Sequence, residues 1–507
     1  MRRNFVRGKL IFLLLLASCQ ADKENFEVFN DRDIIQVNLN TLNDITPYIK
    51  QISITSFSHL TLNITDISSN VAFYIVQIHS HLHPVALSYD KYYAKRVFGT
   101  NIGLYVKPNL NNITSLYLKN DGVYSAKALL VIMNYNDKAP IPGGCNMEFD
   151  TEIAPYAKVL TRDGMITVDV QPASVPLNKT AVSMCDKNPV THDMYQVYLP
   201  QQDLSSKTYF AYITNMLTVN DIIENGQKIS TPDLFKPLRR IFNAYIGTGS
   251  VYVTVATYGT QSAAYVPAFS YACDPAEFPT SCQVLDNTYS KFMVACCFFV
   301  GLASVFLGSK CIKLDVAVPV FFTAAVISYV VTEQSLTLAW VLGLCIAVLF
   351  GICQKFMVFN LFVPMSLGFF IACFAYFTFP ESLVLLHSDW MFWFLFVTAI
   401  VVVCITKKLL FFFTVGHVTC AIIGSYMLIV PFDYYAESTL KYIIFNFVRR
   451  CTVTDFKYAI IQPPIQYKDI TLIVFWVLLA SWRFISIFWS PTLRVPFSRP
   501  TEVTPLL

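Results

Sequence analysis

Charged residues are scarce in this sequence. Only 14% of its 507 residues are Asp, Glu, Lys or Arg, whereas 55% are hydrophobic, and a soluble protein has roughly 25% charged residues. The formal charge of +4 is spread thinly, without the dense basic patch that a nucleic-acid binder needs. A single soluble enzyme and a nucleic-acid partner are therefore excluded. Long apolar stretches fall after Tyr289, which predicts a membrane protein with a large polar head.

The apolar half has few ionisable residues from which a catalytic or ion-coupled site could be built. Asp315, His417 and Arg483 stand apart from one another, with no second carboxylate or histidine at metal-ligand spacing. We expect Asp315 and Arg483 to reach the membrane surfaces and His417 to pack between helices. The sequence predicts no enzymatic activity and no cofactor.

Histidines alternate at only one place, His79, His81 and His83. Three imidazoles on one face of a strand could hold zinc or copper if a carboxylate joined them. A solvent-exposed strand face gives the same alternation, and Pro84 ends the strand at once. We therefore expect a solvated face and no metal site.

The motifs of a G-protein-coupled receptor are also missing. The third apolar segment ends at Lys355 without Asp-Arg-Tyr, and the last has no Asn-Pro-x-x-Tyr. Lys407 and Lys408 lie in an inner connection of only a few residues, which leaves little surface for a G protein. Seven spans alone do not imply that activity.

The amino terminus has the pattern of a secretory signal. Arg2, Arg3, Arg7 and Lys9 precede an apolar core, 10–17, that is too short to span a bilayer. We expect residues 1–21 to be a signal peptide, which delivers 22–289 to the lumen or exterior.

Seven later segments are long and apolar enough to cross as helices. They are 291–309, 314–332, 335–353, 356–379, 390–406, 409–430 and 469–489. With the head outside, Lys310, Lys313, Lys355, Lys407 and Lys408 face the cytoplasm, and the short outer connections carry Glu333, Glu381 and Asp389 without Lys or Arg. The positive-inside rule therefore agrees with the signal peptide. We expect a seven-helix domain over 290–490 and a cytoplasmic tail over 491–507.

The outer connection from Phe432 to Lys468 is the one long connection. Leu440, Ile443 and Phe447 recur in it at helical spacing beside basic residues. This predicts a short amphipathic helix that lies on the membrane surface or on the bundle.

The head is rich in β-branched and aromatic stretches, such as 71–78, 128–133 and 251–257, with turn signals between them. Short strands at this density predict one or two antiparallel sandwiches, with a division near 139–144. Four cysteines, Cys145, Cys185, Cys273 and Cys282, imply two disulfides in an oxidising compartment. Three connectivities are open, and proximity favours Cys145 with Cys185 and Cys273 with Cys282.

Two further patterns predict processing and sorting. Asn63, Asn112 and Asn178 begin N-glycosylation sequons in the expected compartment. The tail ends Glu502-Val-Thr-Pro-Leu506-Leu507, which matches an acidic dileucine signal for clathrin adaptors. We expect the protein in the plasma membrane, the endosomal–lysosomal membrane, or both.

Several strings in fixed order resemble the transmembrane 7 superfamily member 3 family. They include Asp66-Ile-Ser-Ser-Asn70, Pro142-Gly-Gly-Cys145-Asn-Met-Glu148, Ser262-Ala-Ala-Tyr-Val-Pro267, Ile423-Gly-Ser-Tyr426 and Thr504-Pro-Leu-Leu507. The resemblance implies a seven-span protein with a glycosylated, signal-bearing ectodomain, associated with survival of stressed secretory cells and with insulin secretion. It supplies no catalytic residues. The tail is shorter than the family leads us to expect, which puts tail-borne regulatory contacts in doubt.

The sequence therefore predicts a multipass α-helical membrane protein of seven spans with a β-rich, disulfide-bonded luminal or extracellular head. Its predicted function is non-enzymatic support of cell survival under stress and of secretory homeostasis. A receptor for an unknown luminal protein or ligand, signalling without G proteins, is the alternative. A conduit for small solutes or lipids ranks third.

Overall fold

The structure is a computed structural model. It describes residues 26–39, 46–108, 113–145, 157–177, 185, 189–229, 238–307, 312–332, 335–352, 359–379, 383–409 and 414–489. The predicted signal peptide and tail, with Glu502, Leu506 and Leu507, lie outside the described residues, as do Asn112 and Asn178. The chain divides into two compact units, Met1–Asp137 with Ser205–Thr214, and Lys138–Leu204 with Asn215–Leu507.

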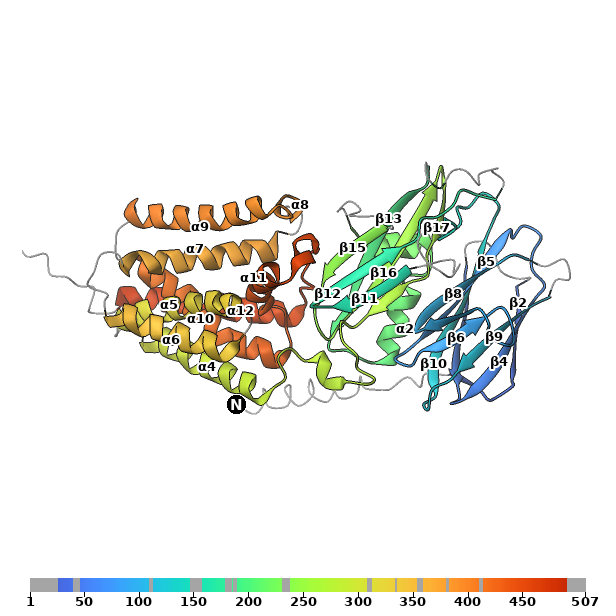
Figure 1. Ribbon diagram of the computed structural model, residues 1–507, viewed down its shortest axis with the longest axis horizontal. Coiled ribbons are helices and arrows are strands. Elements are labelled where there is room, and N and C mark those ends of the chain that lie inside the picture. Colours follow the sequence, from blue (N-terminus) through green and yellow to red (C-terminus); the bar gives the residue numbers. More distant parts are fainter. Residues whose placement is uncertain are drawn as a thin grey trace, which may run out of the picture. The chain divides into compact units, whose positions relative to one another are not determined.

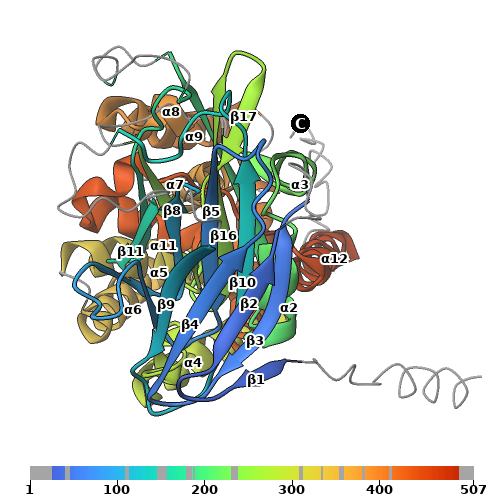
Figure 2. The ribbon, with the colours of Figure 1, turned by 90° about the vertical axis from the view of Figure 1, so that its right-hand side faces the viewer.

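The first unit is a sandwich of two five-stranded sheets (Figure 2). One sheet has the order β1 (Glu27–Phe29), β3 (Tyr48–Ile54), β10 (Ala126–Tyr135), β5 (Phe73–Ser80), β8 (Asn101–Val106); the other has β2 (Ile34–Asn38), β4 (Ser58–Thr65), β9 (Ile113–Asn120), β6 (Val85–Ser88), β7 (Arg96–Gly99). Buried and exposed residues alternate along β2 and β4, as a sheet with one face in the core requires. Ile35, Leu62 and Ile78 belong to the shared core.

A helix from much later in the sequence completes this unit. α2 (Ser206–Thr214) packs through Tyr209 and Phe210, both buried. The Tyr209 hydroxyl donates to Asn101 Oδ1 at 2.8 Å, and the ring of Phe210 lies 5.6 Å from that of Phe26. Because this helix covers part of the outer face, β5 is buried on both faces.

The β domain of the second unit is also built from two sheets. One has the order β11 (Ala157–Arg162), β12 (Met165–Val170), β15 (Leu238–Asn243); the other has β14 (Gln227–Lys228), β13 (Thr191–Gln201), β16 (Thr248–Tyr258), β17 (Gln261–Ala264), with β18 (Ala268–Ser270) also paired to β16. A short helix, α3 (Val219–Asn225), is capped by Thr218, whose hydroxyl accepts from the Asp221 amide. The unit boundary at 137/138 lies just before the division expected near 139–144.

The rest of the second unit is helical, with its long helices side by side (Figure 1). They are α4 (Thr288–Leu307), α5 (Ile312–Val331), α6 (Leu336–Ile352), α7 (Phe359–Thr378), α9 (Asp389–Leu409), α10 (Thr414–Ala436) and α12 (Tyr467–Trp489). Shorter helical segments are η1 (Pro279–Cys282), α8 (Leu383–Leu386), α11 (Tyr442–Thr452) and η3 (Thr454–Tyr458).

The long helices lie over the seven predicted apolar segments. Among the described residues, five helices are long and apolar enough to cross a membrane: Thr288–Leu307, Leu361–Thr378, Asp389–Lys407, Gly416–Ala436 and Tyr467–Ser486. Val316–Val331 and Leu336–Ile352 are apolar but shorter. The structure therefore supports a multispan helical region with five candidate spans.

Candidate functional site at the junction of the second β domain and the helices

The site is built on the connection between α10 and α12, residues 437–466. Its helix, α11, presents Ile443 and Phe447 to the bundle, because helical spacing places them on one face. The Phe447 ring lies 4.9 Å from that of Phe369 and 5.1 Å from that of Phe396. The predicted amphipathic helix therefore lies on the bundle.

Asp469, in the first turn of α12, is the central acceptor of the junction and is fully buried. Its Oδ1 accepts from the Ser438 hydroxyl at 2.5 Å, from the Thr439 amide at 2.7 Å and from the Thr439 hydroxyl at 2.6 Å. Its Oδ2 accepts from Gln201 Nε2 at 2.7 Å and from the Gln466 amide at 2.8 Å. Five donors satisfy the oxygens of this carboxyl group, as the burial of a polar group requires.

A second buried carboxylate, Asp433, holds the start of the same connection. It accepts from the amides of Leu440 and Lys441, at 2.7 and 2.9 Å, and lies 3.7 Å from the Lys441 amine. That amine also donates to the Ser438 carbonyl at 2.5 Å. Burial lowers the pKa of Lys441, an effect that Asp433 opposes. The connection is thus fixed to α10 and to α12 by internal polar contacts.

The β domain meets this connection along the edge of β15. Ile460 forms a parallel bridge with Phe242, accepting from the Asn243 amide at 3.1 Å and donating to the Ile241 carbonyl at 2.8 Å. Residue 460 therefore extends the sheet by one strand position, the backbone pairing that an exposed sheet edge offers.

Side chains of β13 reinforce the attachment. The Tyr198 hydroxyl donates to the Gln462 carbonyl at 3.0 Å. The Gln466 side chain bonds twice to the backbone of β13: its Oε1 accepts from the Gln201 amide at 2.9 Å, and its Nε2 donates to the Leu199 carbonyl at 2.8 Å. These contacts join β13 to the residues that lead into α12.

Two neighbouring arginines of α11 bind to different parts of the structure. Arg449 Nη1 donates to Asn243 Oδ1 at 2.6 Å and to the Ala244 carbonyl at 2.9 Å, and its guanidinium lies over the Tyr442 ring. Arg450 Nη2 donates to Asp389 Oδ1 at 2.5 Å, at the start of α9. One helix therefore contacts the β domain and the bundle at once. We define the junction as Gln201, Asn243, Arg449, Ile460 and Asp469 with their partners.

Residues of the sequence-predicted sites lie elsewhere. Disulfides join Cys145 to Cys185 and Cys273 to Cys282, with Cα atoms 5.7 and 5.0 Å apart; these are the pairings that proximity favours. Asn63 lies half-buried on β4, where its Oδ1 accepts from the Ser115 hydroxyl at 2.8 Å.

The expected solvated histidine face is wrong for His79. This side chain is fully buried, with its ring nitrogens 2.7 Å from Asn101 Oδ1 and 3.0 Å from Gln77 Oε1. The physical reason is that β5 is a central strand buried on both faces, so alternation along it does not separate solvent from core. Burial lowers the pKa of His79 to about 4. No group of three potential metal ligands occurs among the described residues.

Arg483, which we expect to reach a membrane surface, has a fully buried side chain. The carboxylates that matter most, Asp433 and Asp469, were not singled out by sequence reasoning. They end one apolar segment and begin the next, so each reads as a membrane-boundary residue. A usable signal was the pair Ser438-Thr439 between them, two adjacent hydroxyls that can donate to a buried carboxylate.

Comparison with known proteins matches three family models in the same order as the structural parts. Residues 40–135 match the TM7SF3-like N-terminal immunoglobulin-like domain, 140–276 match the TM7SF3-like second immunoglobulin-like domain, and 294–488 match the TM7S3/TM198-like domain. The chain belongs to the TM7SF3-like family. Transmembrane 7 superfamily member 3 of Homo sapiens is 26% identical over 442 residues, which cover 82% of this chain and 77% of that protein. The Mus musculus protein is 26% identical over 444 residues, 82% of this chain and 78% of its own length.

Membership of the TM7SF3-like family identifies the two β domains as immunoglobulin-like and the chain as a multipass membrane protein. The junction therefore connects the second immunoglobulin-like domain to the membrane domain of this family.

Proposed function

We propose that this chain is a non-enzymatic, seven-span membrane glycoprotein whose second immunoglobulin-like domain and membrane bundle work as one body. We propose further that it supports cell survival under stress and secretory homeostasis of the insulin-secretion type. The observation that carries the first part is Asp469, which accepts from Gln201 of the β domain and from Ser438 and Thr439 of the outer connection. Because five internal donors occupy this carboxylate, we assign it the role of holding the junction together.

Seven crossings are favoured by how the two shorter apolar helices pack. α5 and α6 are close neighbours, and Ala325 of α5 faces Gly343 of α6, where an added Cβ would lie 2.9 Å from the alanine Cβ. Such small-residue contacts are typical of helices within a bilayer. Crossing by both helices gives seven crossings, an odd number, which places the two ends of the chain on opposite sides of the membrane. Together with the positive-inside rule, this favours a head outside and a carboxyl terminus in the cytoplasm.

Topology is tested with epitope tags at both ends of the full-length chain in intact and permeabilised cells. We expect the amino-terminal tag to be accessible from outside and the carboxyl-terminal tag only after permeabilisation. The Asn63→Gln variant tests the glycoprotein assignment, because its loss of one endoglycosidase-sensitive mobility step would place the head in the lumen. Tags accessible from the same side would contradict seven crossings.

The cellular role is tested by rescue in a secretory cell line that lacks the relative of this chain. Wild type and Arg162→Ala, an exposed arginine of the same β domain, should restore survival under endoplasmic-reticulum stress and stimulated secretion. Arg449→Ala, which removes the contacts to Asn243 and Ala244, should restore less at equal surface expression. Equal rescue by both variants would show that the cellular function does not depend on the Arg449 contacts of the junction.

The alternative is a receptor for a luminal ligand that signals without G proteins. It is favoured by the same junction, because a domain held by backbone pairing at Ile460 can pass a displacement to α11 and α12. Proximity labelling from the head and from the tail separately would distinguish the two. Stimulus-dependent tail neighbours favour a receptor, and constant neighbours favour the homeostatic role.

We also propose sorting through Glu502, Leu506 and Leu507 by clathrin adaptors. Changing Leu506 and Leu507 to alanine should move the protein toward the cell surface, as measured by surface biotinylation. An unchanged distribution would dismiss this signal.

A further inference from the structure

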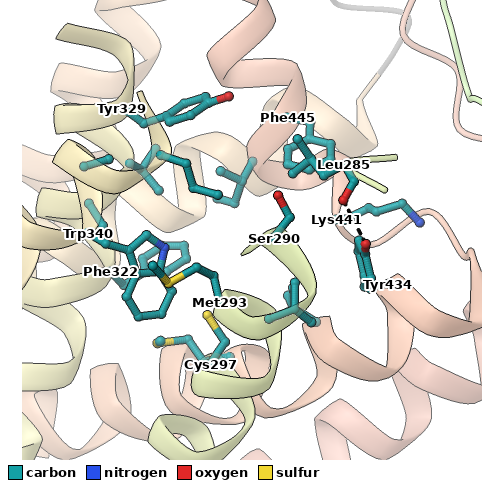
Figure 3. Close-up of a pocket in the computed structure, with 18 of the residues that line it drawn as sticks. Leu285, Ser290, Met293, Cys297, Phe322, Tyr329, Trp340, Tyr434, Lys441 and Phe445 are labelled. Carbon is teal, nitrogen blue, oxygen red and sulfur yellow. Dashed lines mark hydrogen bonds between the residues drawn. The ribbon is translucent and has the colours of Figure 1, made fainter. Parts of the chain in front are cut away.

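A partly open cavity of about 220 Å³ lies between the helices of the bundle, with walls from α4, α5, α6, α10 and α11. Figure 3 shows Met293, Cys297, Phe322 and Trp340 gathered on one side of it. These walls are aliphatic, aromatic and thiol side chains, which suit an apolar occupant. The volume is below the roughly 300–1,000 Å³ of typical pockets for drug-sized ligands. It therefore fits one chain of a lipid better than two.

One polar atom in this wall has no partner. Ser290, in the first turn of α4, is 1% exposed, and its hydroxyl makes no hydrogen bond within the described part of the chain. Figure 3 shows that this hydroxyl has the apolar side chains Met293, Phe322 and Trp340 on one side. Leu285 and Tyr434 lie on its other side. Burying a hydroxyl without a hydrogen bond is energetically unfavourable. A ligand in the cavity with an acceptor group next to Ser290 would accept a hydrogen bond from this hydroxyl.

A second, polar chamber of about 230 Å³ begins where the apolar cavity ends. Tyr434 and Lys441 line both, and the Tyr434 hydroxyl donates to the Leu285 carbonyl at 3.0 Å between them. The charged side chains of the polar chamber are Lys291, Glu437 and Lys441. Lys291 pairs with Asp286, and the Lys441 amine is held by Ser438 and Asp433. The chamber thus offers polar surroundings with charges of both signs.

The order of these features matches the order of groups in a lipid. Ser290 and the polar chamber lie at the end of α4 that follows the β domain in the chain, and Cys297 lies two turns further along the helix. We propose that this cavity binds the acyl chain of a single-chain lipid, whose head group accepts a hydrogen bond from Ser290 and extends toward the polar chamber. A fatty acid and a lysophospholipid share this chemistry. The site shares Lys441 and α11 with the connection that carries the junction, and it does not rest on the proposed cellular role.

The test uses full-length protein in phosphatidylcholine nanodiscs with two photoreactive probes. One is a palmitic acid with a diazirine in its chain, and the other is a lysophosphatidylcholine with the same chain. We expect saturable labelling of peptides that contain Met293 and Cys297, competed by the unlabelled lipid. The probe that labels at the lower concentration identifies the head group.

Variants separate the cavity from the outer surface of the bundle. Val294→Phe fills the cavity and should reduce saturable labelling at least tenfold. Leu302→Phe, the same kind of enlargement at an exposed position of α4, should leave it unchanged. Ser290→Ala should weaken apparent affinity about fivefold to tenfold, because one hydrogen bond is lost.

A size-exclusion profile of each variant, compared with wild type, serves as the control for folding. If Val294→Phe folds and labels like wild type, the proposal is wrong. Labelling that is not saturable, or that maps to outward positions such as Phe299 instead of Met293 and Cys297, would also overturn it, because it would report bulk bilayer lipid.

Discussion

The side-chain amide of Gln201 donates to the carboxylate of Asp469 at 2.7 Å, across 268 positions of sequence. Gln201 ends β13 of the second immunoglobulin-like domain, and Asp469 begins α12. Both are buried, at 5% and 0% exposure. The bond therefore ties the last helix of the bundle to the β domain in surroundings from which water is excluded, where an unmatched polar group is costly.

Removing this amide should destabilise the junction. Gln201→Leu leaves Asp469 with four of its five donors and should lower the free energy of unfolding by about 1–3 kcal/mol. Asp469→Asn should cost at least as much, because an amide has one acceptor oxygen in place of two. Equilibrium unfolding of the full-length protein in detergent measures both. A double-mutant cycle should give a coupling of about 0.5–3 kcal/mol, and purely additive losses would contradict a direct bond.

Loss of the Arg449 side chain should loosen the β domain from the connection without unfolding either. Arg449→Ala removes the hydrogen bonds to Asn243 Oδ1 and to the Ala244 carbonyl. We expect faster hydrogen–deuterium exchange in β15 and in 454–461, where Ile460 pairs with β15. Arg162→Ala is the matched control and should leave these peptides protected. Equal exchange in the two variants would show that the backbone bridge holds the junction alone.

Local sequence patterns predicted the parts of this molecule better than its assembly. Apolar segments located the seven long helices because each segment is read from consecutive residues. Alternation such as that of β4 located strands, and proximity favoured both disulfide pairings. The spacing of Ile443 and Phe447 predicted α11, since one helical face must be buried.

The junction could not be predicted in this way, because its contacts join residues that no periodicity relates. Ile460 pairs with Phe242, and Gln201 meets Asp469, only after two separate elements have folded. The prediction of a solvated face at His79 was wrong for a related reason. The helix that helps bury β5 is formed by residues 206–214, more than a hundred positions later. Burial of that strand is a tertiary property that overrides local alternation.

Acid should destabilise the first immunoglobulin-like domain through His79. Its pKa is about 4 when folded, against about 6.5 when unfolded. The folded pKa is depressed, so the unfolded state takes up the proton first, and stability is lost as the pH falls from about 6.5 toward 4. The loss should reach about 2 kcal/mol at pH 5.

Hydrogen–deuterium exchange in β5 and β8 measures this effect, comparing pH 7 with pH 5 after correction for intrinsic rates. His79→Gln should remove most of the pH dependence, whereas His59→Gln, at an exposed position of β4, should retain it. A wild-type domain whose protection does not change between the two pH values would contradict the burial of a neutral imidazole.

Close packing of α4 against α10 should make Gly301 intolerant of any side chain. A Cβ added there would lie 2.5 Å from the backbone nitrogen of Leu428 and 2.7 Å from its Cα. Because backbone atoms cannot rotate away, Gly301→Ala must separate the two helices, at a cost of about 1–3 kcal/mol.

Gly351→Ala in α6 is the control, since a Cβ there meets no heavy atom within 4 Å. Alanine should be neutral or slightly stabilising at Gly351, where it has the higher helix propensity. Thermal unfolding of both variants in detergent decides the matter, and an unchanged midpoint for Gly301→Ala would show that α4 and α10 do not pack as closely as the structure has them.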